Sequence, residues 1–111
     1  MPLYMVSFYD GDMQFSMEDL PAVAAASNAV VDEAIAAGVW VFGGGFMGYA
    51  ASWVQADGTE TPAPTRAAAP VGGFSIINVD THEQAVYWAS RIADGCRCPQ
   101  ELREFMPGAR Y

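Results

Sequence analysis

The C-terminal third of the chain constrains the fold most. Its sequence pattern predicts a strand, a helix and a strand with few residues between them. Residues 72–79 are an apolar run that opens on two glycines. Asp80 or Thr81 then caps a helix, with an acid or amide three residues on to complete a capping box. The apolar residues of this helix recur at helical spacing: Ala85, Trp88, Ala89 and Ile92. A last strand over residues 100–106 completes half of a ferredoxin-like α+β unit.

The N-terminal half predicts a similar unit. Residues 3–9 are apolar and rich in β-favouring types, which indicates a strand that ends in a turn. Residues 21–37 carry one apolar stripe at helical spacing, with Asp19 as the expected cap and Gly38 as the terminator. A second strand is expected over residues 39–42.

The middle of the chain is expected to be less regular. We predict a bend at Gly43–Gly45, a third strand over residues 49–55 and a hairpin turn at Asp57-Gly58. Residues 60–71, with three prolines, predict a surface loop with a short edge strand. The whole order predicts a single domain over residues 1–111 with a ferredoxin-like split βαβ fold and an antiparallel sheet.

Such a sheet has both helices on one face, which leaves the other face uncovered. That face is expected to carry Phe74, Ile76 and Asn78, which cannot all be left in water. We therefore expect two copies to pair through it as a homodimeric α/β barrel, with a ligand cavity between the facing sheets.

The composition of the chain argues against several classes of function. The net charge is −8, from 13 acids against 5 basic residues, and all five are arginines, since the chain has no lysine. Such a chain is poorly suited to nucleic acid or to anionic membranes. The N-terminus lacks the pattern of a signal peptide, and the longest apolar stretch, residues 34–42, is too short to span a bilayer. With only Cys96 and Cys98, expected to be free thiols, we predict a cytoplasmic protein.

Residues 72–91 (GGFSIINVDTHEQAVYWASR) resemble the YCII-related family, in the branch named for an Asp-Gly-Pro-Phe motif. Members of that branch have Gly-Gly-Phe, an apolar strand, a helix with Trp-Ala-x-Arg, and a strand of the form Glu-Val-Arg-Pro, which residues 101–104 match. The Asp-Gly-Pro-Phe signature itself is missing where Thr61–Pro64 stands, and the helix histidine of another branch has no counterpart near Ser27-Asn28. The resemblance implies a dimeric α/β barrel.

The last strand carries the most interesting candidate chemistry. Glu101 and Arg103 are two residues apart, so they point to the same face, while Leu102 points toward the helices. Charges on the barrel-facing side must be paired, solvated or bound to a ligand. One interpretation is a structural ion pair or a dimer contact. The other is that Arg103 anchors a carboxylate, phenolate or phosphate and that Glu101 orients it or acts as a base.

Further residues are expected to line the same cavity. Tyr9 and Asp10, at the end of the first strand, can reach it, and apolar walls are expected from Met47, Tyr49 and Trp53. We expect small-molecule binding, with a cofactor-independent lyase or isomerase acting on a cyclic or aromatic acid as the reaction, if there is one. Arg103 would stabilise negative charge, and Asp10 or Glu101 would transfer the proton. The alternative is a non-catalytic ligand-binding or regulatory module.

Other motifs are interpreted as structural. Residues 43–48 satisfy G-x-G-x-x-G, but the residues after them read as a strand, whereas dinucleotide binding requires a helix there. His82 is the only histidine and is expected at an exposed helix start. The acids around Asp10 and Asp12 lack calcium-loop spacing. We predict no metal and no cofactor.

Overall fold

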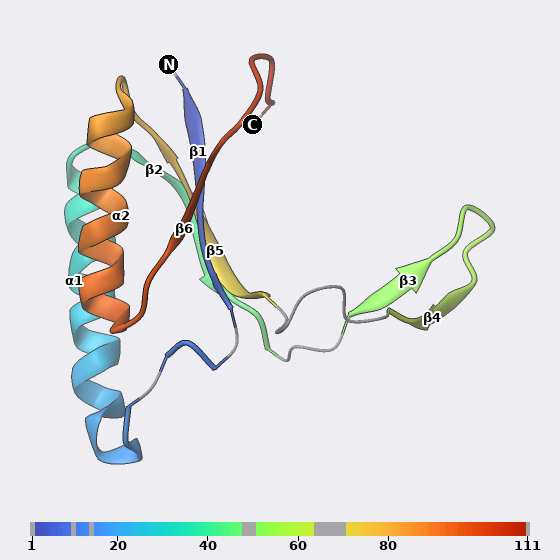
Figure 1. Ribbon diagram of the computed structural model, residues 1–111, viewed down its shortest axis with the longest axis horizontal. Helices are drawn as coiled ribbons and strands as arrows, with labels where there is room; N and C mark the ends of the chain where they lie inside the picture. Colours follow the sequence, from blue (N-terminus) through green and yellow to red (C-terminus); the bar gives the residue numbers. More distant parts are fainter. Residues whose placement is uncertain (1, 10, 14, 48–50, 64–70, 111) are drawn as a thin grey trace.

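The computed structural model describes residues 2–9, 11–13, 15–47, 51–63 and 71–110. Its main sheet has four antiparallel strands in the order β2-β5-β1-β6 (Figure 1). The strands are β1 (Leu3–Tyr9), β2 (Trp40–Gly45), β5 (Val71–Asn78) and β6 (Glu101–Glu104). β1 and β2 flank β5, and β5 and β6 flank β1, which is the order of a split βαβ unit. The predicted α+β class with an antiparallel sheet is confirmed and is compatible with a ferredoxin-like fold.

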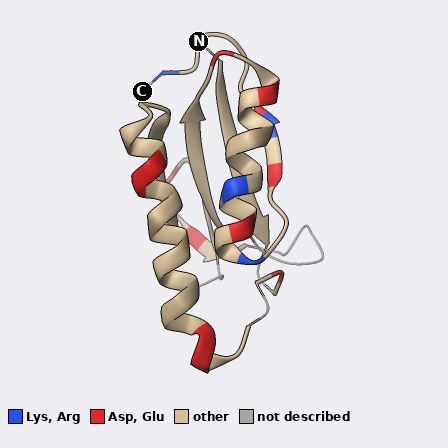
Figure 2. Ribbon diagram, turned by 90° about the vertical axis from the view of Figure 1, so that its left-hand side faces the viewer, with Lys and Arg blue, Asp and Glu red and all other residues tan. Residues whose placement is uncertain are grey.

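Two helices cover one face of this sheet: α1 (Leu20–Ala36), which follows a short 3₁₀ turn η1 (Met17–Asp19), and α2 (His82–Cys96). Figure 2, viewed from the helix side, shows both helices lying in front of the sheet. Val6 and Ile77 from the sheet are fully buried against Val30 of α1 and Ala85 and Ile92 of α2. No helix in the described ranges is both long enough and apolar enough to cross a membrane.

The helix ends follow from local sequence. The Thr81 hydroxyl accepts a hydrogen bond from the Gln84 backbone N–H at 3.1 Å, and the Gln84 side chain accepts one from the Asp80 N–H at 2.9 Å. This reciprocal pair is the predicted capping arrangement, with Thr81 as the cap. Gly38, at φ +75°, ends α1 as expected because glycine takes this left-handed backbone at little cost.

The glycines of β2 do not form the bend that the sequence predicted. Gly43, Gly44 and Gly45 continue the strand and pair with Ser75, Phe74 and Gly73 of β5. The irregularity in the pairing lies earlier, between Trp40 and Phe42. The next described element after β2 is a strand, so the described residues contain no helix in the position that a dinucleotide-binding turn requires.

A separate hairpin projects from the main sheet (Figure 1). It consists of β3 (Ser52–Val54) and β4 (Glu60–Pro62), which pair only with each other among the described strands. The predicted turn at Asp57-Gly58 is confirmed: Gly58 has φ +89°, and the Asp57 carboxylate accepts a hydrogen bond from the Thr59 N–H at 2.9 Å. The strand expected near residues 49–55 therefore exists over part of that range, but in the hairpin.

Candidate functional site

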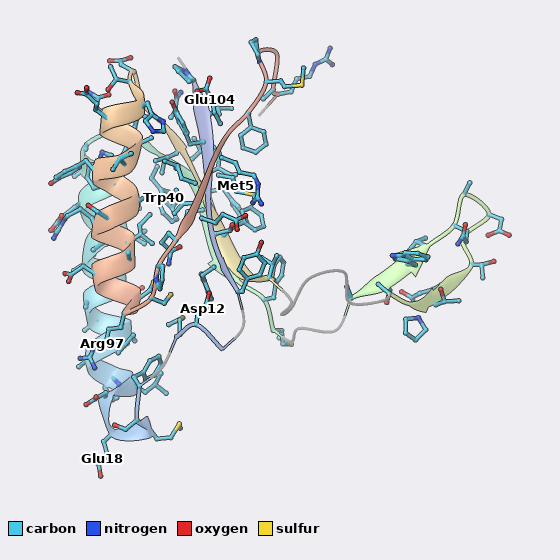
Figure 3. The ribbon with its side chains drawn as sticks, in the orientation of Figure 1. Met5, Asp12, Glu18, Trp40, Arg97 and Glu104 are labelled. Atoms are coloured by element: carbon cyan, nitrogen blue, oxygen red, sulfur yellow. The ribbon has the colours of Figure 1, made fainter. Side chains whose placement is uncertain are left out.

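The sheet face that the helices leave uncovered is rich in aromatic side chains. Alternation along the strands places Met5 on this face and Trp40 on the helix side, which Figure 3 shows directly. The rings of Phe42 and Phe46 pack against Phe74, with ring centroids 6.2 and 5.9 Å from that of Phe74. Phe42 is 60 % exposed and Phe46 is 50 % exposed. We call this face, with its three phenylalanines, the open face.

Three polar side chains meet on the open face at the edge formed by β1 and β6. The register pairs Ser7 with Glu101, so Tyr9 lies diagonally across from Glu101 on the same face. The Tyr9 hydroxyl donates to the Glu101 carboxylate, with oxygen–oxygen distances of 3.0 and 3.3 Å. The Arg103 guanidinium forms an ion pair with the same carboxylate. Tyr9, Glu101 and Arg103 are called the open-face cluster below.

The electrostatics of the cluster keep the arginine charged. A hydrogen bond with Tyr9 and then the negative charge of Glu101 raise the pKa of Arg103. The Arg103 side chain is 56 % exposed, so its ion pair is screened by water and contributes little to stability. Guanidinium has five N–H donors, and two partners leave some of them for a further acceptor. The cluster can therefore take an anion from solvent without first losing its own contacts.

A second tyrosine–glutamate contact holds the same edge strand from the helix side. The Tyr4 hydroxyl donates to Glu104 at 3.0 Å, and burial, followed by the hydrogen bond to Glu104 and its charge, raises the pKa of Tyr4. The Phe105 N–H donates to the Leu3 carbonyl at 2.8 Å just beyond β6. β6 is thus fixed on both faces, which fixes the direction in which Glu101 and Arg103 project.

The structure brings together three of the seven residues predicted for the site: Tyr9, Glu101 and Arg103. Asp10 and Tyr49 lie outside the described residues. Trp53 belongs to β3 in the projecting hairpin, away from the cluster (Figure 1), and Met47 is fully exposed beyond the end of β2. Within one chain, neither residue forms a wall beside the cluster.

Phe42 and Phe46 supply exposed apolar surface on the same face, at the edge of the sheet opposite to β6, and neither was predicted from the sequence as a site residue. The signal was present, because positions 42, 44 and 46 point to one side of an extended strand. The alternation was not recognised because a bend was predicted at the glycines between positions 42 and 46. Once Gly43–Gly45 are strand residues, the two phenylalanines lie on either side of Gly44 and both face Phe74.

The other titratable candidates lie apart from this cluster. His82 is exposed in the first turn of α2, as predicted, with its ring centroid 6.0 Å from that of Tyr4. Cys96 and Cys98 are not bonded to each other, and burial raises the pKa of the Cys98 thiol to about 11. Among the described residues, no group of three or more His, Cys, Asp or Glu side chains is arranged to hold a metal ion.

Fold and site together define a class: a small α+β protein with an uncovered aromatic sheet face and a Tyr–Glu–Arg cluster at its edge. Neither a scan against protein-family models nor a search of curated proteins finds a match to this chain.

Proposed function

We propose that two copies of the chain pair through their open faces as a homodimeric α/β barrel that binds a small organic acid between the sheets. The observation that carries the proposal is that the open-face cluster shares its sheet face with the exposed Phe42 and Phe46. A contiguous exposed apolar surface of this kind commonly marks an interface. A two-fold dimer uses the same surface of both copies, so one sheet face is sufficient to build it.

The chemistry of the cluster favours a cyclic or aromatic acid as the ligand. Arg103 offers a planar, permanently charged set of donors, which suits a carboxylate or a phenolate. Tyr9 fixes Glu101, and Glu101 in turn orients the guanidinium. The rings of Phe42, Phe46 and Phe74 provide apolar surface on the same face for the body of the ligand.

If the protein is an enzyme, the cluster supports proton transfer without a cofactor. Glu101 would accept a proton from carbon next to the ligand carboxylate, and Arg103 would stabilise the negative charge that develops there. Returning the proton to a different carbon completes an isomerisation, and loss of a leaving group completes a lyase reaction. Asp10 stays a predicted second acid–base group.

The alternative is a non-catalytic ligand-binding or regulatory module. One observation favours it: Glu101 already accepts a hydrogen bond from Tyr9 and pairs with Arg103, so its carboxylate is well satisfied. A base must release such partners before it can accept a proton. We further propose membership of the YCII-related family, supported by the sequence of residues 72–91 and by the split βαβ strand order.

An Arg103→Gln variant tests the ligand assignment. We expect it to weaken the binding of simple aromatic acids, such as benzoate and 4-hydroxybenzoate, by about 10- to 100-fold, because a hydrogen bond to a charged group contributes about 1.5–3 kcal/mol. Isothermal titration calorimetry measures the change. Arg91→Gln is the matched control, because Arg91 also pairs with a glutamate, Glu33, but on the helices. Equal affinities for Arg103→Gln and the wild type would refute the anchor.

Deuterium exchange distinguishes the proposed enzyme from the alternative of a non-catalytic binding module. In D₂O, an isomerase or lyase of this kind is expected to exchange a ligand C–H for C–D, seen as loss of a proton NMR signal, and Glu101→Gln should slow that exchange at least about 100-fold. Binding of the acid without exchange of any carbon-bound proton would favour the non-catalytic module.

A further inference from the structure

A cavity of about 370 Å³ lies on the helix side of the sheet, opposite to the open-face cluster. β1, β2 and β5 form one wall, and α1 and α2 form the other. Its volume falls at the lower end of the range of ligand pockets, which is roughly 300–1,000 Å³. Trp40, which Figure 3 shows between the sheet and the helices, is one of its lining residues.

Small residues on two neighbouring strands, Gly43 and Gly45 of β2 and Ser75 of β5, line the sheet wall of the cavity. On the helix side of β2, Trp40 is followed by Gly43 and Gly45, and these pair with Ser75 and Gly73 of β5. The open space lies at Gly45, where an added Cβ would meet only the Gly72 carbonyl oxygen, at 3.7 Å, whereas Cβ atoms on Gly43 and Gly73 would collide with their neighbours. Protein interiors are normally close-packed, and unfilled volume costs stability. Unfilled space beside Gly45 is therefore expected of a binding site more than of a plain core.

Two aromatic rings border the space that the glycines leave. A Cβ atom on Gly43 would lie 2.6 Å from the Trp40 ring, and one on Gly73 would lie 3.1 Å from the Phe8 ring. Both rings therefore lie over the glycines on the helix side, and both line the cavity. Two rings beside a glycine floor suit a flat aromatic molecule.

The polar groups of the cavity are neutral and lie toward the helices. The Ser27 hydroxyl of α1 and the Cys96 thiol of α2 are in contact, with 3.6 Å between oxygen and sulfur. Asn28 and Gln100 add amide groups to the lining. None of the described lining residues is Asp, Glu, Lys, Arg or His. A charged ligand would lose its hydration here without gaining a counter-charge, which is costly.

We propose that this cavity is a second binding site, for a small neutral aromatic molecule that carries one hydrogen-bonding group. The rings of Phe8 and Trp40 hold the aromatic part, and Ser27 or a neighbouring amide receives the polar group. The site lies within one chain, so it does not depend on the dimer or on the acid ligand proposed above. The two sites also differ in charge preference: neutral on the helix side and anionic on the open face.

Binding of N-phenylnaphthylamine, a neutral fluorescent aromatic amine with one N–H, tests the proposal. We expect its fluorescence to rise saturably with the wild-type protein, with a dissociation constant on the order of 10–100 µM. A Gly45→Leu variant should weaken binding at least about tenfold, because its side chain enters the cavity. The backbone accepts this change, since a Cβ on Gly45 would meet only the Gly72 carbonyl oxygen, at 3.7 Å.

Gly44→Leu is the matched control: the Gly44 backbone borders the cavity, but Gly44 pairs with Phe74, so the new side chain would project to the open face. A Cβ added at Gly44 would meet no atom within 4 Å. This variant should bind the probe as the wild type does. Loss of binding in Gly44→Leu but not in Gly45→Leu would overturn the proposal and assign the probe to the open face. Absence of saturable binding by the wild type below about 1 mM would also overturn it.

Protection of Cys96 gives a readout that needs no variant. Trypsin cleavage after Arg91, Arg97 and Arg103 puts Cys96 and Cys98 on separate peptides, so mass spectrometry reports N-ethylmaleimide labelling of each. A saturating concentration of the probe should slow the labelling of Cys96 at least about fivefold. N-ethylmaleimide reacts only with an exposed thiolate, and the bound probe would cover the Cys96 sulfur. Cys98, buried and with its pKa raised to about 11, should react slowly with or without probe. Unchanged Cys96 labelling in the presence of bound probe would overturn the proposal.

Discussion

A Phe42→Glu variant is expected to be monomeric at concentrations at which the wild-type protein forms the proposed dimer. Phe42 is 60 % exposed in the single chain, so the substitution removes little packing from the monomer. In the proposed barrel the same position is buried against the partner sheet, next to Phe74. Burying an unpaired carboxylate costs several kcal/mol, so the dimer should weaken by at least about 100-fold.

An Ile35→Glu variant controls for the added charge. Ile35 is 56 % exposed and lies on α1, away from the open face, so this variant gains the same charge at a similar exposure. Sedimentation velocity over a range of protein concentrations measures both. The interface is misassigned if Phe42→Glu associates as strongly as Ile35→Glu and the wild type.

Gly73→Ala is expected to destabilise the fold strongly. Gly73 lies in β5, between β1 and β2, and an added Cβ would be 2.7 Å from the Gly44 carbonyl oxygen and 2.9 Å from the Gly45 Cα. Both contacts are with backbone, so β2 must move away from β5 to relieve them. Overpacking of this kind costs about 2–3 kcal/mol. The expected fall in the melting temperature is roughly 8–15 °C.

Gly44→Ala is the matched control on the paired strand. A Cβ there meets nothing within 4 Å, so its effect on the free energy of unfolding should stay within about 1 kcal/mol. Chemical denaturation followed by circular dichroism compares the two variants. Protein concentration must be held equal, because association stabilises the folded state by mass action. If both variants lost a similar amount of unfolding free energy, then β2 and β5 would not approach each other as closely at Gly73 as described.

The fold was predictable where local chemistry and periodicity agreed. The cap at Thr81, the stripe of α2 and the terminator at Gly38 each depend on neighbours within a few residues, and the structure has all three. The hairpin turn at Asp57-Gly58 is local in the same sense. The glycines of β2 were wrongly predicted to bend, because glycine permits a bend but equally permits a flat strand against a close neighbour.

The site was predictable only in part, because side-chain alternation gives the face of a residue but not the partner of its strand. Alternation placed Glu101 and Arg103 together, and strand β1 brought Tyr9 to them. Trp53 was expected in the same cavity, yet its strand pairs with β4 in the projecting hairpin. The helix-side cavity was missed because small residues on β2 and β5 form one space only when the register is known.

Native mass spectrometry of the protein as purified distinguishes the proposed dimer from a single chain. We expect a mass of twice the 11.9 kDa chain, with any bound acid seen as extra mass that is lost on denaturation. The Phe42→Glu variant, sprayed under the same conditions, should give the single-chain mass. A wild-type protein that appears only at 11.9 kDa across micromolar concentrations would contradict the barrel, and with it the inter-sheet site for the acid.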